Sequence, residues 1–237
     1  RAGLDLLPRA RQALEALEAC VRAARGDLGP APIELVLGTR HELGLSWVVP
    51  QLDRLARLHP ELTLHLYFGA ADDLLLRLRM REIDCAITSS RFNDPRLDAV
   101  RLHREEYVFV ASRKLLARTP LTRAEHAASH ALLDASADMP LFRYWRDAPG
   151  GGDRLRFARV QRIGTIAAIE ALVRAGRGVA VLPRYLVEKS LARGELRRVF
   201  PSVHPLSDYF RLVFRTDDPR RPLFESLGAE MLEVPLA

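Results

Sequence analysis

The chain has 237 residues, of which 36 are Lys or Arg and 30 are Asp or Glu, so its formal net charge is +6. Hydrophobic residues make up 48% and charged residues 28%, a balance typical of globular proteins that excludes disordered, collagen-like and disulfide-stapled classes. No run approaches the ~18 consecutive apolar residues of a membrane span, and the amino-terminal residues lack the apolar centre of a signal peptide. We therefore expect a cytoplasmic protein with no membrane partner.

The amino-terminal segment carries the pattern of a long helix. Leu7, Leu14, Leu17 and Val21 belong to an apolar stripe whose members are alternately three and four residues apart. An isolated helix would leave this stripe in water, so we expect a second copy of the chain to cover it in a dimer or larger oligomer. Glycines and prolines then end the helix, and residues 1–32 are interpreted as a linker and oligomerisation helix.

Strands and helices alternate after this segment. The sequence predicts strands at Ile33–Gly38, Leu62–Phe68 and Cys85–Thr88, with helices at Leu45–Leu58 and Asp72–Arg81. Because parallel strands need crossover connections, this order predicts a parallel sheet with helices on its faces. Two further extended segments follow, at Leu97–His103 and Tyr107–Ala111.

A second alternating series begins near residue 121. Its predicted elements are helices at Leu121–Ala128, Thr165–Ala175 and Tyr185–Ala192, strands at Ala131–Asp134, Arg159–Ile163, Val179–Leu182 and Leu196–Phe200, and a loop at Ala135–Asp153. A last strand at Tyr209–Arg215 and a last helix at Leu223–Leu232 complete the pattern. We therefore predict two α/β units of similar size.

No catalytic or metal-binding motif stands out. The two cysteines are far apart in the sequence and suggest neither a disulfide framework nor a metal cluster. His126 and His130 are four residues apart on a predicted helix, but Ala127 stands where the zinc-protease motif needs Glu. Residues 176–178 contain two glycines after a helix and before a strand, the reverse of a dinucleotide-binding loop. We therefore predict no enzyme, no metal and no cofactor.

Residues that follow the predicted strands are better candidates for binding. In open parallel sheets, ligands lie beyond the carboxyl ends of the strands, where helix N-termini present free N–H groups. Arg40 offers a guanidinium suited to a carboxylate, and two opposed helix N-termini favour a small organic acid. A helix cap is the alternative role for hydroxyls such as that of Thr165. The candidate effector positions are Thr39, Arg40, His41, Gly69, Ala70, Ser89, Pro140, Phe142, Thr165 and Ile166.

Three separated stretches resemble the LysR family of transcriptional regulators. Residues 48–66, followed by Gly69 and by Leu74–Ile87 with its segment Glu82–Ile87, resemble the first regulatory subdomain of that family. Ala171–Pro183 resembles the signature of its second subdomain, and Arg1–Arg11 resembles the end of the DNA-binding unit and the start of its linker helix. The resemblance extends over nearly the whole chain.

The resemblance implies an α/β fold with two Rossmann-like subdomains of the type II periplasmic-binding-protein architecture, preceded by a long linker helix. Subdomain I would comprise residues 33–112 and 208–237, and subdomain II residues 113–207. The strands Tyr107–Ala111 and Tyr209–Arg215 would connect the two. A small-molecule effector would bind in the cleft between the subdomains and control transcription.

The resemblance also implies partners. Members of the family bind DNA through a winged helix-turn-helix domain before the linker helix, so DNA is expected to bind only through that domain, which the present sequence lacks. A second copy of the chain, in a dimer or tetramer, and RNA polymerase are the other macromolecular partners implied.

Two features depart from the family's pattern. Arg81 stands where Gly is usual, and Ala70 and Ala71 replace residues with a hydroxyl or amide that reaches the effector.

Two other classes of protein share this two-lobed architecture. One is the solute-binding protein of a transporter, against which the linker helix and the lack of a signal sequence both argue. The other is an enzyme on the same fold, which would need a nucleophile or an acid–base pair between the subdomains. The sequence offers no convincing pair of this kind.

Overall fold

A computed structural model describes residues 32–152 and 154–236 of the chain. It also describes part of the amino-terminal segment, namely Leu6, Ala10, Ala13, Leu14, Ala16, Leu17, Cys20, Val21 and Ala24, all of them helical and exposed. Leu14, Leu17 and Val21 of the predicted stripe are therefore seen on a helix, and Leu14 and Leu17 are 59% and 62% exposed. Leu7 lies outside the described residues.

The first subdomain is built around a five-stranded sheet with the order β2-β1-β3-β10-β4. Its elements are β1 (Ile33–Thr39), α2 (His41–Leu43), η1 (Gly44–Val48), η2 (Val49–Gln51), α3 (Leu52–Leu58), β2 (Leu62–Phe68), α4 (Ala71–Arg79), β3 (Cys85–Thr88), β4 (Leu97–Glu105), β10 (Asp208–Arg215) and α9 (Arg221–Leu232). β1 pairs in parallel with β2 and β3, as predicted, whereas β10 pairs antiparallel with β3 and β4. The sheet is therefore mixed.

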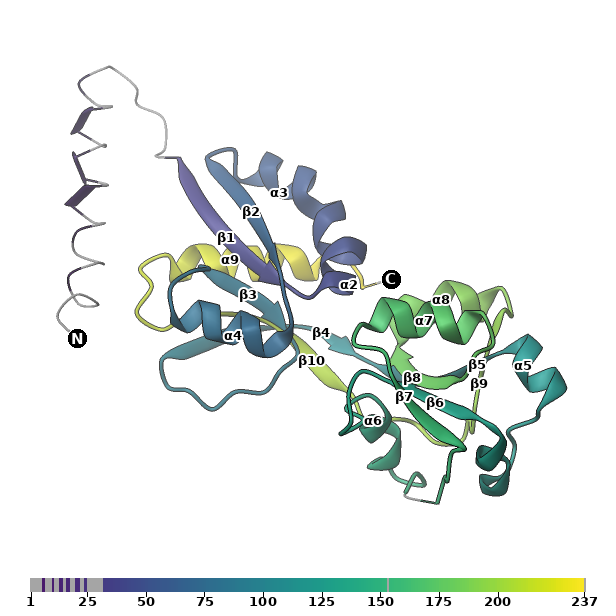
Figure 1. The fold of residues 1–237 in the computed structure, drawn as a ribbon. Helices are drawn as coiled ribbons and strands as arrows, with labels where there is room; N and C mark the ends of the chain where they lie inside the picture. The colour runs from purple at the N-terminus through teal and green to yellow at the C-terminus, as the bar shows by residue number, and fades with distance from the viewer. Residues whose placement is uncertain are drawn as a thin grey trace.

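The second subdomain contains another five-stranded sheet, in the order β7-β6-β8-β5-β9. Its elements are β5 (Tyr107–Ser112), α5 (Arg113–Arg118), η3 (Ala124–Ser129), β6 (Ala131–Asp134), α6 (Phe142–Arg146), β7 (Arg159–Arg162), α7 (Ile166–Arg174), β8 (Val179–Pro183), α8 (Arg184–Ala192) and β9 (Leu196–Arg198). Figure 1 shows the two subdomains side by side, joined where β4 leads into β5 and where the chain returns to β10. None of the helices formed by the described residues is long and apolar enough to cross a membrane.

Several elements differ from the sequence prediction. Residues 107–112 were assigned to subdomain I, but β5 hydrogen-bonds to β8 and β9 of the second sheet, so the chain passes between the sheets at Glu106. The predicted helix at Leu121–Ala128 is a shorter 3₁₀ segment, η3. Helices α5 and α6 were missed, because each is short and shows too little apolar periodicity to stand out. The predicted helix at Leu45–Leu58 begins earlier, at His41, and contains a π-helical turn.

Hydrophobic cores lie on both faces of the first sheet, because successive residues of a strand point to opposite faces. On one face, Phe214 of β10 stacks on Phe224 of α9 with ring centroids 5.0 Å apart. On the other face, the neighbouring Val213 packs with Leu74 and Leu78 of α4. The helices α9 and α4 therefore cover opposite faces of the sheet, and the prediction that helices lie on its faces is confirmed.

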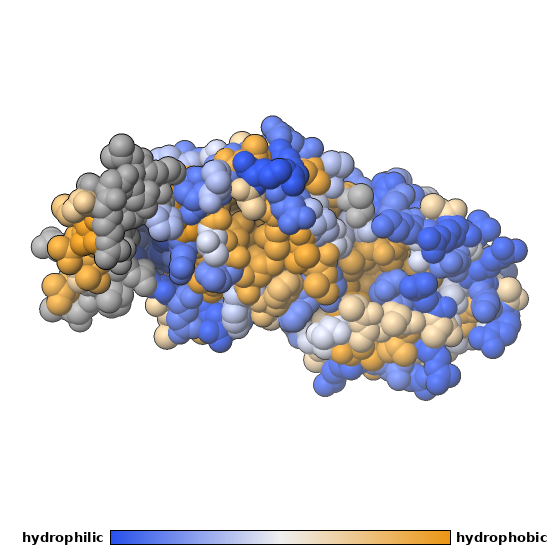
Figure 2. Space-filling view, turned by 90° about the horizontal axis from the view of Figure 1, so that it is seen from above, coloured by the Kyte–Doolittle hydropathy of each residue, from blue (hydrophilic) through white to orange (hydrophobic). Residues whose placement is uncertain are grey.

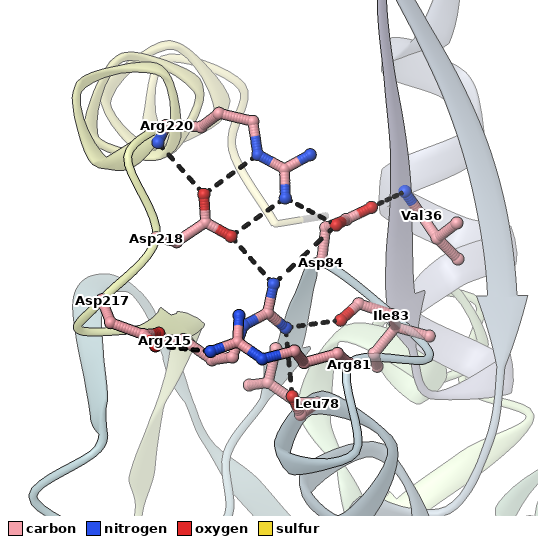
Figure 3. A network of polar contacts seen from close by, with 9 residues as sticks. All are labelled: Val36, Leu78, Arg81, Ile83, Asp84, Arg215, Asp217, Asp218 and Arg220. Carbon is pink, nitrogen blue, oxygen red and sulfur yellow. Dashed lines mark hydrogen bonds and ion pairs between the residues drawn. The ribbon is translucent and has the colours of Figure 1, made fainter. Parts of the chain in front are cut away.

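Charged side chains also fix the outer end of the first subdomain (Figure 3). The buried guanidinium of Arg215 donates to Asp218 at 2.8 Å and to two backbone carbonyl oxygens at 2.9 and 3.0 Å. Arg220 donates to Asp84 at 2.6 Å, and Asp84 in turn accepts the backbone N–H of Val36 at 2.8 Å. This network joins the middle of β1, the residue before β3 and the end of β10 to the start of α9, so its role is to hold these elements together.

Candidate functional site

Arg40 directly follows β1 and lies at the junction of the two subdomains. Its Nη2 atom is 2.6 Å from Oε1 of Glu105, the last residue of β4, whose side chain is 0% exposed. Its Nη1 donates to the hydroxyl of Ser89 at 3.2 Å, and its guanidinium carbon lies 5.3 Å from the ring centre of Phe210. The predicted positions Arg40 and Ser89 are thus brought together. However, the Arg40 charge is already matched by Glu105, a residue that the sequence analysis did not select.

Three tyrosines of the second subdomain complete this polar junction. Tyr107 and Tyr144 stack with ring centroids 3.9 Å apart, and burial raises the pKa of both. Burial is also the main reason why the pKa of Tyr185 is raised, so all three phenols stay neutral near pH 7. Burial by itself lowers the pKa of Arg40, but the charge and hydrogen bond of Glu105, together with the neighbouring Tyr185 and Tyr107, outweigh burial and the net pKa is raised. The junction is therefore a neutral, hydrogen-bonding environment around one buried ion pair.

That buried pair does not use all of its hydrogen-bonding capacity. Among the described residues, Nε of Arg40 and Oε2 of Glu105 are buried without a hydrogen-bond partner. One donor and one acceptor are therefore left for a group from outside the chain. Buried polar atoms of this kind carry a free-energy cost of ~1 to 3 kcal/mol each until they are paired.

The start of α7 forms the second part of the site. Thr165 is the N-cap residue, and its hydroxyl accepts the backbone N–H of Ala168 at 3.3 Å. The neighbouring N–H of Ala167 donates to the carboxylate Oε1 of Glu42 at 3.0 Å. Glu42 lies in α2, in the other subdomain and 125 residues away in the sequence. The N-termini of α2 and α7 therefore meet across the junction, and a carboxylate connects them.

Two predicted positions next to Arg40 have mainly structural contacts. Thr39 is fully buried, and its hydroxyl donates to the carbonyl of Arg40 at 3.4 Å. His41 is exposed, and its ring stacks on Phe68 at the end of β2, with centroids 5.3 Å apart. The side chain of Thr39 therefore faces the protein interior, whereas that of His41 remains accessible.

The turn between β2 and α4 contains Gly69 and Ala70. The N–H of Gly69 donates to the carbonyl of Thr39 at 3.0 Å, which ties this turn to the end of β1. A Cβ atom at position 69 would lie 2.6 Å from the carboxylate of Asp73 and 2.9 Å from the ring of Tyr67, so these side chains would have to shift to admit any residue larger than glycine. Ala70 is exposed and precedes α4, where its methyl group supplies no cap.

The predicted apolar wall is wrong for Phe142. This side chain is only 4% exposed and stacks on Trp145 in the core of the second subdomain, with centroids 5.5 Å apart. The reason is the buried carboxylate of Asp134, which accepts the N–H of Phe142 at 2.8 Å and two further backbone N–H groups, folding the loop inward. Ile166 also packs against this core, whereas Pro140 is half-buried.

Two cavities lie on the side of the junction formed by α8. The larger has a volume of 740 Å³ and is bounded by α8, β9, the end of β4 and residues 204–207. The smaller has a volume of 440 Å³ and extends to Tyr185 and the carboxyl-terminal residues. Neither contains a predicted effector position in its lining. Within the described part of the chain, no three His, Cys, Asp or Glu side chains gather in a way that would hold a metal ion.

Residues 29–235 match the protein family described as the LysR substrate binding domain. The chain belongs to this family. Curated relatives of this LysR domain include a glycine cleavage system transcriptional activator homolog of Haemophilus influenzae, 28% identical over 178 residues, and the HTH-type transcriptional regulator AbaB of Streptomyces antibioticus, 31% identical over 166 residues. The matches cover 73% and 65% of this chain and 56% and 53% of those relatives, so the chain spans about half their length.

Solved structures show the same fold. The regulatory domain of CrgA, a LysR-type transcriptional regulator from Neisseria meningitidis, matches with a TM-score of 0.70 at 20% identity, over 86% of this chain and 100% of that one. The effector domain of AmpR from Pseudomonas aeruginosa matches with a TM-score of 0.67 at 20% identity, over 85% and 94%. The two-subdomain, type II periplasmic-binding-protein-like fold expected from the sequence is thus confirmed.

Proposed function

We propose that this LysR domain senses a small organic acid held between its two subdomains. The observation that carries the proposal is the contact between Glu42 and the N–H of Ala167. A carboxylate bound at the start of α7 from the opposite subdomain has the chemistry and the position expected of an effector carboxylate. Free N–H groups and the positive end of the helix dipole favour such an anion.

The buried Arg40–Glu105 pair limits which chemical class of effector the proposed site can bind. Because Glu105 already neutralises Arg40, the guanidinium is not a free anion site, contrary to the role that the sequence suggested. On this proposal the N–H groups at the start of α7 bind the carboxylate of the effector. The rest of the effector molecule faces neutral tyrosine side chains and backbone groups. A monocarboxylic acid with an uncharged polar or aromatic body fits this environment best.

Effector binding at this position would compete with Glu42. Both carboxylates need the N–H of Ala167, so an effector that takes this donor releases Glu42 and breaks a contact between the subdomains. The relative position of the subdomains then depends on the effector concentration. A ligand shifts such an equilibrium only through its different affinity for the two arrangements, and displacement of Glu42 supplies that difference.

The complete protein is proposed to be a cytoplasmic DNA-binding transcriptional regulator. The relative from Streptomyces antibioticus is named an HTH-type transcriptional regulator, and this chain covers 53% of it. On this proposal DNA binds through a separate domain, RNA polymerase is a further partner, and this chain catalyses no reaction. The ligand of the LysR domain then controls how the DNA-binding domains are positioned relative to DNA.

Self-association is the other part of the proposal. Leu14, Leu17 and Val21 are exposed on the amino-terminal helix. Figure 2 also shows hydrophobic surface over the first subdomain. Among the exposed apolar side chains of that subdomain, Leu45 is 65% exposed and Val49 is 39% exposed. A second copy of the chain would remove both apolar surfaces from water.

Binding measurements on variants of Glu42 test the proposed site. Ligands retained after native purification are first identified by mass spectrometry, and a thermal-shift screen of small carboxylic acids supplies further candidates. Isothermal titration calorimetry then compares the wild type with Glu42→Ala. We expect the variant to bind an effector up to about fivefold more tightly, because the effector no longer displaces a carboxylate whose contact with the helix N-terminus contributes up to about 1 kcal/mol.

Two further variants control this experiment. Glu82→Ala removes the same charge from an exposed ion pair with Arg77 and should leave the affinity unchanged. Ala167→Pro removes the N–H donor itself in the first turn of α7, where proline is tolerated, and should abolish carboxylate binding. An identified effector that binds the folded Ala167→Pro variant as tightly as the wild type would show that the start of α7 is not the site.

A further inference from the structure

The larger cavity beside α8 carries more positive than negative charge. Arg104, Arg184, Arg197 and Arg198 line it, together with Glu106 and Glu188. Four arginines against two glutamates leave an excess of two positive charges (4 − 2 = 2) before His204 is counted. Its volume of 740 Å³ lies within the range of about 300 to 1,000 Å³ found for small-molecule sites.

Two of the four arginines, Arg184 and Arg104, form ion pairs with the two glutamates. Arg184 donates to Glu188 at 2.7 Å and to Glu106 at 3.2 Å, and Arg104 lies 3.7 Å from Glu106. The hydrogen bond from Arg184 is the main reason why the pKa of Glu188 is lowered, so this carboxylate is ionised at neutral pH. These four residues therefore make a network with no net charge, and this network is one wall of the cavity.

Arg197 and Arg198 supply the excess charge. Both lie on β9, the short edge strand of the second sheet, and both are exposed. Among the residues that the structure describes, neither has an acidic side chain as a hydrogen-bond or ion-pair partner, although the charge of Arg198 helps to lower the pKa of Glu188. Arginine presents a planar fork that binds phosphate or carboxylate oxygens in pairs.

We propose that this cavity binds a small polyanion, such as a phosphorylated or polycarboxylic metabolite, at a second site separate from the one between α2 and α7. The paired arginines hold the wall in place, and Arg197 and Arg198 contact the ligand. The concave shape favours a small molecule over an extended macromolecule. None of the lining residues is a predicted effector position, so this site does not depend on the proposed organic-acid site.

The position of the cavity connects its ligand to the movement of the subdomains. One wall includes the end of β4, where the chain first crosses between the sheets, and another includes residues 204–207, where it returns. Arg104 and Ser207 join these two segments through a hydrogen bond of 2.8 Å. A polyanion bound here therefore restrains both crossings and biases one arrangement of the subdomains.

Calorimetric titration of the full chain with inorganic pyrophosphate and, separately, citrate tests the proposal. The titration is done at a salt concentration of about 0.15 M, which largely screens the non-specific attraction between an anion and scattered surface charges. Under these conditions we expect saturable binding of one anion per chain. Arg197→Gln/Arg198→Gln should weaken it about tenfold or more. Preferred binding of pyrophosphate identifies a phosphate-bearing ligand, and preferred binding of citrate a polycarboxylate.

Two controls keep this result specific. Arg113→Gln/Arg123→Gln removes two exposed arginines elsewhere in the same subdomain and should leave the affinity unchanged. Glu42→Ala should still bind one anion per chain, because Glu42 lies outside this cavity and affects its affinity only through the arrangement of the subdomains. The proposal is overturned if neither anion binds saturably, if the control pair weakens binding as much as the β9 pair, or if Glu42→Ala abolishes the binding. None of these outcomes decides the organic-acid proposal.

Discussion

The guanidinium of Arg40 and the carboxylate of Glu105 lie 2.6 Å apart, in an ion pair buried where the two subdomains meet. Each residue ends a strand of the first sheet or directly follows one, and the aromatic and phenolic groups around them come from both subdomains. Because burial of a lone charge is costly, neither side chain is tolerated there without the other.

Removal of one partner of this pair should therefore destabilise the fold. We expect Arg40→Met to lower the free energy of unfolding by ~3 to 5 kcal/mol, since it leaves Glu105 charged and unpaired. The double variant Arg40→Met/Glu105→Leu should recover most of that loss, because two apolar side chains need no counter-charge. Urea unfolding measures both values. Equal stability of the single and double variants would contradict a coupled pair.

Much of the fold could be predicted because its strands are short apolar runs bounded by polar residues or turns. Leu62–Phe68 and Cys85–Thr88 have the bounds that the sequence indicated. The α6 helix could not be predicted, because its position depends on the buried carboxylate of Asp134, which accepts N–H groups seven and eight residues further along. The sequence pattern within α6 itself gives no indication of such a contact.

The candidate site was only partly predictable for the same reason. Strand ends led to Arg40, Ser89 and Thr165, because topology places such residues at one edge of a sheet. Glu42 was missed, since the sequence suggested a helix that starts at Leu45 and the contact of Glu42 lies in the other subdomain. An acidic residue two positions after Arg40, and directly after the predicted position His41, was the available signal. Its partner depends on how the two subdomains pack.

The charge network of Figure 3 predicts a loss of stability in acid. Burial alone would raise the pKa of Asp218, but hydrogen bonds from Arg220 and the charges of Arg220 and Arg215 outweigh burial, so the pKa is lowered. A carboxyl group with a lower pKa in the folded chain stabilises the fold above its unfolded pKa of about 3.9 and loses this effect as the pH falls through the folded value.

Asp218→Asn isolates this contribution. We expect the variant to be less stable than the wild type by ~1 to 3 kcal/mol at pH 7, because a hydrogen-bonded charge is lost, and the difference should shrink as the pH falls below about 4. Chemical unfolding across this pH range gives both values. Asp217→Asn, which alters only a more exposed ion pair with Arg81, should change stability by at most about 1 kcal/mol. A difference that stays constant down to pH 2 would show that the Asp218 charge does not contribute.

Arg81 provides a test of backbone strain. It follows α4 with a φ of 62°, in the left-handed region that favours glycine. Because this conformation costs an L-residue about 1 to 2 kcal/mol, Arg81→Gly should be more stable than Arg81→Ala by about 1 kcal/mol. Both variants lose the ion pair with Asp217, so the difference in their thermal unfolding reports the backbone alone. Identical melting temperatures would mean that the turn relaxes without cost.

The amino-terminal helix predicts how the chain assembles. Leu14 and Leu17 are exposed neighbours on one apolar stripe, so Leu14→Glu/Leu17→Glu would put two charges into any interface formed there. We expect this variant to have a lower mass than the wild type by light scattering at equal concentration, and deletion of residues 1–30 should have the same effect. Leu76→Glu/Met80→Glu adds equal charge to exposed positions in and just after α4 and should leave the mass unchanged. If only the α4 variant dissociates, the interface belongs to the first subdomain, and the proposed role of the helix is wrong.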